Sequence, residues 1–312
     1  MAVCGVLQLW LIPAVVWSIA FPYIQIGLLC LAIKYWNSHS LIKYSSILIA
    51  LICLTEIGFG LYSKTNLRQE GSESVTEIKI MTYNLLFKNP DPAQSAALIK
   101  ETDPDILFVQ ELTPQWSTLI DQVVGERYPY KIAQPLNGYH GIAIYSKYEI
   151  DNQVLLNTQS GKPFAICADL RLGNHTIQLI NVHLSSPGGA VENPRQFIPL
   201  YAENYAIRTG QIKELNRLTD DTAYTAQILA GDLNTLQCEP IYKQLRLHWV
   251  DTGERVFRWS RFNFPNSSRL MPIMTLDYIM GRGSLRLQDS EVIREGSSDH
   301  FPVITTLQIG SN

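Results

Sequence analysis

The chain has 312 residues, of which 46% are hydrophobic and 17% charged, and its formal net charge is −3. That length allows one large domain or two small ones. Four basic and three acidic residues precede Thr76, which leaves 21 Lys and Arg against 25 Asp and Glu in the remainder, a net of −4. Because an avid, sequence-independent nucleic-acid binder carries a basic face, this balance disfavours polymeric DNA as the main substrate.

Two long apolar runs open the chain. No charged residue occurs in Met1–Ile33, and the second run, Tyr44–Tyr62, contains only the charge of Glu56. About 20 apolar residues cross the hydrocarbon core of a bilayer, so we expect membrane spans near residues 12–33 and 44–62. A cleaved signal peptide is disfavoured, because no Lys or Arg precedes the first run and no convincing cleavage site separates the two runs.

The number and direction of the spans depend on few residues. Pro13 and Pro22 allow the first run to form one kinked helix or two short ones, of which we favour the single span. Lys34 and Lys43 lie in the loop between the runs, which contains no acid. The positive-inside rule then places this loop in the cytoplasm and the C-terminal domain outside it. We therefore expect a multi-pass integral membrane protein.

The polar segment that follows contains Gly71, Ser72 and Ser74 and is typical of a flexible tether. The sequence thus predicts a membrane anchor over residues 1–63, a linker over 64–76 and one large domain over 77–312.

Within the large domain, strand-like runs alternate with helix-like ones. High β-branched content and flanking turn residues predict strands at Ile78–Tyr83, Ile106–Val109, Gly141–Tyr145, Phe164–Leu170, Thr176–Val182, Gln227–Ala230, Asp277–Met280 and Val303–Ile309. Helices are expected at Asp91–Glu101, Gln115–Val124, Asn204–Leu218 and Pro240–Gln244. In the third helix, Ile207, Gln211, Leu215 and Leu218 fall on one predicted stripe.

Polar residues with catalytic potential lie on or just after these apolar runs. They are Asn84, Glu111, His183, Asp232, Asn234, Asp277, Asp299 and His300. A sheet fixes the geometry of residues at its strand ends while the loops leave them open to substrate. Carboxylate and amide oxygens suit Mg²⁺ or Mn²⁺, and histidines suit proton transfer and phosphate recognition. This set predicts metal-assisted hydrolysis of a phosphate ester.

Several of these residues have a specific expected role and a simpler alternative. If the strand continues through Asp232 and Asn234, both side chains point the same way, an arrangement suited to activating water and binding phosphate. Alternatively, the two residues form a turn closed by a side-chain hydrogen bond. Glu111 is either a Mg²⁺ ligand or an exposed charge that ends a strand. A carboxylate near His300, from Asp277 or Asp299, would fix the tautomer of its imidazole.

The ordered set resembles the endonuclease/exonuclease/phosphatase superfamily. The likeness extends over about residues 78–309 and includes Gln110-Glu111, Asn181-x-His183, Gly231-Asp232-x-Asn234 and Ser298-Asp299-His300. Two further elements match, namely the segment from Gly141 to Lys147 and Arg208-x-x-Gln211. The resemblance implies an α+β fold, a four-layer sandwich of two packed, mostly antiparallel sheets with helices outside.

The resemblance also implies roles by position. Glu111 would bind the metal, helped by Asn84 and Asp299. Asp232 would align or activate the attacking water, and Asn234 would hold the scissile phosphate. His183 and His300 would bind phosphate oxygens and stabilise their developing charge, with Asp277 orienting His300.

The chain departs from the superfamily at one position. Nuclease branches often carry an acid two residues after the first-strand Asn, where this chain has Leu86. The departure favours one metal over two.

Two functions remain at this stage. The first is a membrane-anchored, Mg²⁺- or Mn²⁺-dependent phosphodiesterase or phosphatase, with a lipid or small phosphoester slightly favoured over nucleic acid. The second is an inactive membrane-tethered module that uses the same fold to bind a partner. A turnover assay separates the two.

Overall fold

The computed structural model describes Tyr44 and residues 76–219, 223–255, 258–267 and 272–310. The expected membrane spans and nearly all of the linker therefore lie outside the described residues. Within the described ranges, no helix combines the length and the hydropathy needed to cross a membrane.

The described secondary structure belongs to the expected large domain. Its strands are β1 (Thr76–Asn84), β2 (Ile106–Gln110), β3 (Tyr130–Gln134), β4 (Ile142–Ser146), β5 (Ile150–Asn157), β6 (Pro163–Leu172), β7 (His175–His183), β8 (Ala226–Asp232), β9 (Val250–Asp251), β10 (Asp277–Gly283), β11 (Leu285–Val292) and β12 (Val303–Ile309). Its α-helices are α3 (Pro92–Thr102), α4 (Pro114–Val124), α5 (Gly188–Glu192), α6 (Phe197–Thr219) and α7 (Pro240–Leu245). Short 3₁₀ turns are η1 (Gly125–Arg127), η2 (Pro194–Gln196), η3 (Thr252–Arg255) and η4 (Arg258–Arg261).

The strands form two six-stranded sheets. The first has the order β11-β12-β1-β2-β4-β3 and the second the order β5-β6-β7-β8-β10-β9. Only the β1–β2 pair in the first sheet and the β7–β8 pair in the second are parallel, and the other neighbours are antiparallel. The expected pair of mostly antiparallel sheets is therefore confirmed.

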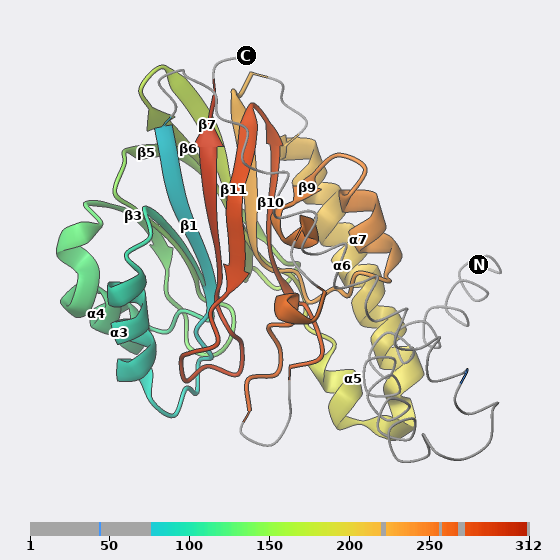
Figure 1. The fold of residues 1–312 in the computed structure, drawn as a ribbon. Helices are drawn as coiled ribbons and strands as arrows, with labels where there is room; N and C mark the ends of the chain where they lie inside the picture. The colour runs from blue at the N-terminus through green and yellow to red at the C-terminus, as the bar shows by residue number, and fades with distance from the viewer. Residues whose placement is uncertain (1–43, 45–75, 220–222, 256–257, 268–271, 311–312) are drawn as a thin grey trace.

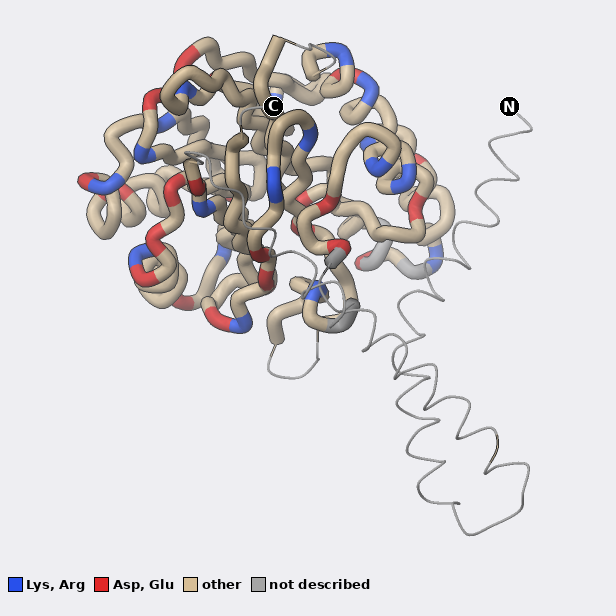
Figure 2. The backbone as a smooth tube through the Cα atoms, turned by 45° about the horizontal axis from the view of Figure 1, so that its top comes forward, with Lys and Arg blue, Asp and Glu red and all other residues tan. Residues whose placement is uncertain are grey.

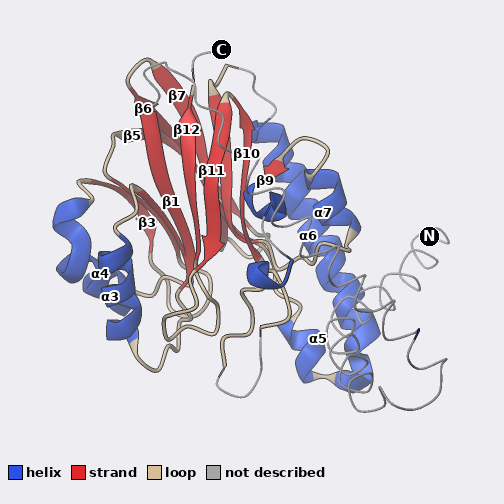
Figure 3. Ribbon diagram, in the orientation of Figure 1, coloured by secondary structure: helices blue, strands red, loops and turns tan. Residues whose placement is uncertain are grey.

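The two sheets and the helices outside them form four layers (Figures 1 and 3). Three hydrophobic clusters lie between these layers. The central cluster joins the two sheets, with Ile80 and Phe108 from the first packed against Ile166 and Ile228 from the second. A second cluster lies between the second sheet and helices α6 and α7, and a third lies between the first sheet and helices α3 and α4. Residues that alternate along a central strand thus contact different layers, which buries both faces of each sheet.

The strands and helices predicted from the sequence are present, with one error in α6. That helix begins at Phe197 rather than Asn204, and Ile207, assigned to its buried stripe, is 46% exposed. Gln211 and Leu215 are buried as expected and Leu218 is half-buried, while Arg208 and Ile212 are buried as well. The predicted stripe is therefore wrong only at Ile207, because the charged residue Arg208 occupies the interior position.

The charge distribution agrees with the overall composition. Basic and acidic residues are interspersed around the described tube in Figure 2. Such mixing provides little of the one-sided field that steers a long polyanion to a surface.

Candidate active site

The register of the strands brings the predicted polar residues to one end of the two sheets. Asn84 pairs with Gln110 at the ends of parallel strands β1 and β2, so Glu111 follows directly beside it. His183 likewise pairs with Asp232 at the ends of β7 and β8. Asp277 begins β10 opposite Asp232. His300 precedes β12, whose first residue pairs near the end of β1.

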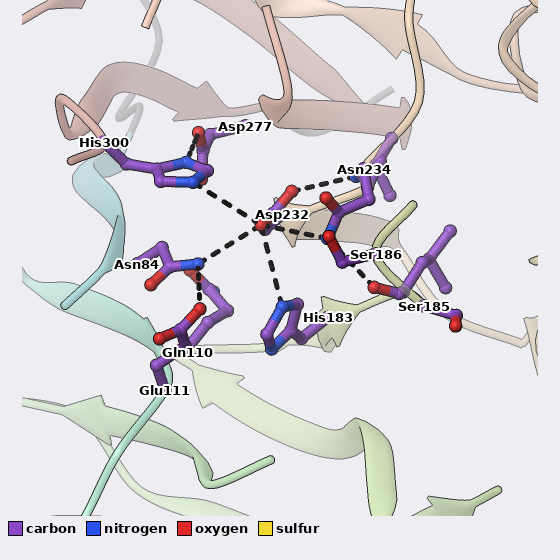
Figure 4. Close-up of polar contacts among 12 residues, drawn as sticks. Asn84, Gln110, Glu111, His183, Ser185, Ser186, Asp232, Asn234, Asp277 and His300 are labelled. Atoms are coloured by element: carbon purple, nitrogen blue, oxygen red, sulfur yellow. Dashed lines mark hydrogen bonds and ion pairs between the residues drawn. The ribbon is translucent and has the colours of Figure 1, made fainter. Parts of the chain in front are cut away.

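Asp232 is the centre of the resulting network (Figure 4). Its Oδ2 accepts hydrogen bonds from Nδ2 of Asn84 at 3.2 Å and Nδ2 of Asn234 at 3.1 Å. The same oxygen lies 3.7 Å from Nε2 of His183 and 4.0 Å from Nε2 of His300. Asp232 is only 1% exposed. A buried carboxylate is therefore held by two amides and flanked by two imidazoles that approach from different sheets.

Asp277 and His300 form a buried acid–imidazole pair. Nδ1 of His300 lies 2.7 Å from Oδ2 of Asp277. Burial alone would lower the pKa of His300, but the charge and hydrogen bond of Asp277, with the charges of Asp232 and Asp299, raise that pKa to about 10. Burial raises the pKa of Asp277, with Asp232 adding to the rise and His300 opposing it. The pair therefore retains a proton at neutral pH, and we place it on the imidazole because three carboxylates surround that ring.

Glu111 provides an oxygen donor of the kind that a hard cation requires. Its half-buried carboxylate accepts from the Phe87 N–H at 2.9 Å and from Nδ2 of Asn84 at 3.2 Å, one bond at each oxygen. A carboxylate oxygen has two lone pairs, so each oxygen keeps one for a metal ion. Hard oxygen ligands with space for water fit Mg²⁺ or Mn²⁺.

Asp299 stands apart from the other predicted ligands. Its carboxylate lies 3.5 Å from the Ser298 hydroxyl, and its charge contributes to the raised pKa of His300. In the described part of the chain, no hydrogen bond joins Asp299 to Glu111 or Asn84. Its role as a metal ligand therefore stays a prediction.

A second group of metal-type donors surrounds Asp232. Ligand atoms of Asp232, Asp277 and His300 lie within 4.8 Å of one another. The hydrogen bond between Asp277 and His300 accounts for the closeness of two of them. The group is therefore better explained as an acid–imidazole pair beside a carboxylate than as a cation site.

The loop after β8 adopts the turn alternative rather than a continued strand. The strand ends at Asp232, whose Oδ1 accepts from the Asn234 N–H at 2.8 Å, and Asn234 has a φ of +47°. Both N–H groups of the Asn234 amide are engaged, since Nδ2 also donates to the Leu184 carbonyl at 3.0 Å. In this arrangement Asn234 orients Asp232, and phosphate binding by Asn234 stays a prediction.

Gly231 lets β7 and β8 come together beside this turn. Its φ is +142°, and an added Cβ would lie 1.9 Å from the Val182 carbonyl oxygen. Only glycine fits there without moving one of the strands that carry His183 and Asp232.

Helix α6 supports the loops that follow β7 and β8. The sequence predicted that its supporting residues match the family pattern, but it did not predict their contacts. Arg208, fully buried, donates to the Asn234 carbonyl and to the Thr235 hydroxyl at 3.0 Å, and pairs with Glu239 at 2.9 Å. One turn later, the Gln211 side-chain oxygen accepts from the Ser185 N–H at 3.0 Å. The i, i+3 spacing of Arg208 and Gln211 could have predicted that both side chains lie on the same face of the helix.

Two further polar residues fix the sheets and the β12 loop near the site. Asn181 of the second sheet donates to the carbonyls of Val109 at 2.9 Å and Ala143 at 2.6 Å in the first sheet. The Ser298 hydroxyl donates to the Asn84 carbonyl at 2.6 Å and accepts from the His300 N–H at 3.1 Å.

Comparisons with known proteins agree with this arrangement. The profile of the Endonuclease/Exonuclease/phosphatase family matches residues 81–300. No curated protein matches the chain. Solved structures with the same fold include D. rerio TDP2 complexed with single strand DNA product, with 18% identity, a TM-score of 0.59, and coverage of 74% of this chain and 99% of that one. A family protein from Bacteroides thetaiotaomicron has 18% identity and a TM-score of 0.53, and the match covers 77% of this chain and all of that one.

Proposed function

Because the chain belongs to the endonuclease/exonuclease/phosphatase family, a family of divalent-metal-dependent phosphoric ester hydrolases, we propose that it hydrolyses phosphoesters at the Asp232 site. The observation that carries the proposal is the convergence of two imidazoles and two amides on one buried carboxylate beside Glu111 (Figure 4). Each component of phosphate hydrolysis has a candidate there: a base, hydrogen-bond donors from the two imidazoles and a metal ligand.

Asp232 is the candidate for aligning and deprotonating the attacking water. The hydrogen bonds of Asn84 and Asn234 fix both oxygens of its carboxylate, so the side chain has one orientation. A positioned base of this kind typically accelerates proton transfer by about 100-fold to 10,000-fold.

His300 supplies positive charge on the substrate side, and His183 supplies a second ring nitrogen. His300 is protonated at neutral pH because its pKa is raised to about 10, and Asp277 holds its Nδ1, so Nε2 points toward the centre. Nε2 of His183 approaches the same region from the end of β7. Both rings would donate to phosphate oxygens as negative charge develops there.

The residues on the Glu111 side would hold the cation. Glu111 supplies the carboxylate, with Asn84 beside it and Asp299 as the third candidate. A bound Mg²⁺ or Mn²⁺ shields the phosphate charge and polarises its oxygens. Leu86, where related nucleases often have an acid, supports a single cation.

The proposals for the substrate and for the location of the protein rest on the sequence. We propose that residues 12–33 and 44–62 anchor the chain in a membrane, with the catalytic domain outside the cytoplasm, and that a lipid or small phosphoester is the substrate. The net charge of −4 after residue 75 supports this choice. TDP2 was solved with a single strand DNA product, which keeps nucleic acid as a second candidate.

The test is hydrolysis of bis(p-nitrophenyl) phosphate during a Mg²⁺ titration of the full chain. We expect Glu111→Gln to shift the Mg²⁺ dependence to higher concentrations. We expect His300→Ala to reduce kcat about 100-fold or more with an unchanged Mg²⁺ midpoint. Matched controls are Glu101→Gln, an exposed carboxylate on α3, and His175→Ala, at the opposite end of β7 from His183.

The alternative is an inactive binding module. It predicts no metal-dependent turnover of this ester or of a lipid, nucleotide or DNA substrate. Turnover that was indifferent to both Glu111→Gln and His300→Ala would place the chemistry elsewhere and refute the proposal.

A further inference from the structure

A partly exposed cluster of aromatic rings borders the site and has no part in the chemistry above. We call it the aromatic rim: Phe87, in the loop after β1, and Tyr139 and His140, in the loop before β4. The ring centroids of Phe87 and Tyr139 are 6.3 Å apart at 62°, and those of Tyr139 and His140 are 4.3 Å apart at 40°. Tyr139 is 52% exposed. Phe87 and His140 are half-buried. An exposed aromatic ring packed against other rings offers a binding surface for a further planar group.

The Phe87 end of the rim is joined directly to the candidate metal ligand. The Phe87 N–H donates to Oε2 of Glu111 at 2.9 Å. The preceding residue is also held, because Nε1 of Trp116 donates to the Leu86 carbonyl at 3.2 Å. The Phe87 backbone therefore cannot move without moving a hydrogen bond of Glu111.

The Tyr139 end is fixed to the same place through the residue after Glu111. Leu112 donates to the Gly141 carbonyl at 2.9 Å, and its own carbonyl accepts from Leu136 at 3.0 Å. A Cβ on Gly141 would lie 1.8 Å from the Leu112 carbonyl oxygen, so this close approach requires glycine. The two loops form a preorganised surface, which lowers the entropic cost of binding.

His140, like Phe87, is a half-buried member of the rim. Burial is the main cause of its lowered pKa, and the charges of His183 and Lys162 add to it. Because the Phe87 N–H is bonded to Glu111, the rim lies beside the part of the site where the cation would bind.

The chemistry of the rim favours a planar aromatic group over an alkyl chain. Aromatic rings offer faces and edges for stacking, and the Lys88 ammonium lies 5.2 Å from the Phe87 centroid, where a phosphoester anion would be attracted. An alkyl chain would gain contact area alone, without the face and edge interactions that a planar ring makes.

We propose that the aromatic rim binds a planar aromatic substituent of the phosphoester, a nucleobase or an aryl group, beside the scissile phosphate. The inference rests on the proposed function and specifies its substrate: a small phosphoester that carries a planar group. Tyr139, as the most exposed ring, is the residue that determines this preference.

The test compares ligands that share a phosphate but differ in what is attached to it. Dissociation constants of deoxyribose 5-phosphate, thymidine 5′-monophosphate, phenyl phosphate and octyl phosphate are measured by calorimetry on the full chain with Mg²⁺. Tyr139→Ala is compared with Tyr130→Ala, a tyrosine that is 40% exposed at the far end of β3, opposite Ser146. Both substitutions remove an exposed tyrosine, so only their position differs.

We expect thymidine 5′-monophosphate and phenyl phosphate to bind at least about fivefold more tightly than deoxyribose 5-phosphate, the lower end of base stacking on an aromatic side chain. Tyr139→Ala should remove that preference while deoxyribose 5-phosphate binds unchanged, and Tyr130→Ala should retain it. A preference for thymidine 5′-monophosphate alone would identify the planar group as a nucleobase.

Three results would overturn the inference. Octyl phosphate that binds as tightly as phenyl phosphate, with equal sensitivity to Tyr139→Ala, would show a merely apolar surface. Equal binding of all four ligands would refute the proposed role of the rim in binding a planar group, and the proposed hydrolase activity would be unaffected. Absence of binding by every ligand, with no turnover of bis(p-nitrophenyl) phosphate, would refute both.

Discussion

Substitutions at Arg208 should distinguish its contribution to the free energy of unfolding from its contribution to the geometry of the site. The Arg208 guanidinium is fully buried, lies between the Tyr201 and Tyr205 rings at 5.7 and 5.9 Å, and donates to the Asn234 carbonyl. It also neutralises Glu239, which is 1% exposed. Arg208→Met keeps much of the side-chain volume but removes both the charge and the donors.

The magnitude follows from what the substitution leaves behind. Glu239 would keep only neutral partners such as the Leu236 N–H, whose bond to Oε1 is 2.8 Å. Breaking a buried ion pair from one side costs about 3–5 kcal/mol, because the remaining charge is uncompensated. Adding Glu239→Gln removes that charge and keeps an oxygen that accepts from Leu236. The double variant should therefore regain most of the lost free energy of unfolding.

Turnover should not recover in the same way. Neither the single nor the double variant holds the Asn234 carbonyl, and a misplacement of about 1 Å in a catalytic group can cost about 100-fold in rate. The assays are urea unfolding and kcat on bis(p-nitrophenyl) phosphate. Arg171→Met is the control, since its side chain is 60% exposed and surface ion pairs such as its pair with Asp151 contribute little to the free energy of unfolding. A double variant with wild-type kcat would refute the positioning role of Arg208.

Three further predictions concern the pair, the β7–β8 contact and the linker. The His300 pKa is raised from 6.5 to about 10, so its contribution to stability is complete below pH 6.5 and lost as the pH rises toward 10. Asp277→Asn should flatten this loss of unfolding free energy with pH. An unchanged dependence of the unfolding free energy on pH would contradict the assignment of the proton to the Asp277–His300 pair. Gly231→Ala should destabilise the domain and abolish turnover, whereas Gly210→Ala, exposed in α6 with nothing within 4 Å of its Cβ, should add about 0.5–1 kcal/mol. Protease added to intact cells with a permeabilised outer barrier should cut within Ser63–Thr76 and release an active fragment; protection until the inner membrane is broken would reverse the proposed orientation.

The central strands could be predicted from the sequence because they are buried on both faces. Val109 and Ala230 each belong to a continuous apolar run that leaves a clear pattern. The polar residues that follow such runs were therefore assigned to strand ends, and strand register then places Asn84 near Glu111 and His183 near Asp232.

The four strands that the sequence did not reveal are the four edge strands, β3, β5, β9 and β11. An edge strand has one free side and needs less apolar surface, and in β5 most residues are exposed. The burial of Arg208 in place of Ile207 on α6 was missed for a related reason, since Arg208 is buried only because Glu239, distant in sequence, compensates its charge. Such pairings depend on tertiary structure and leave no local pattern.

Three of the loops that carry the site share one local device, which provides partners for buried polar side chains. In each loop a side-chain oxygen accepts from the N–H two residues later: Asn84 from Leu86, Asp232 from Asn234, and Ser298 from His300. Leu86 and Asn234 have φ values of +60° and +47°, a conformation that non-glycine residues rarely adopt.

These hydrogen bonds hold the loops in that unusual conformation. The residues proposed for chemistry therefore also determine the backbone on which the chemistry depends. Alanine at Asp232 would remove both the charge and the acceptor for Asn234, whereas asparagine would remove the charge and keep the acceptor. Only the isosteric substitution can therefore measure the chemical role of this carboxylate separately from its structural one.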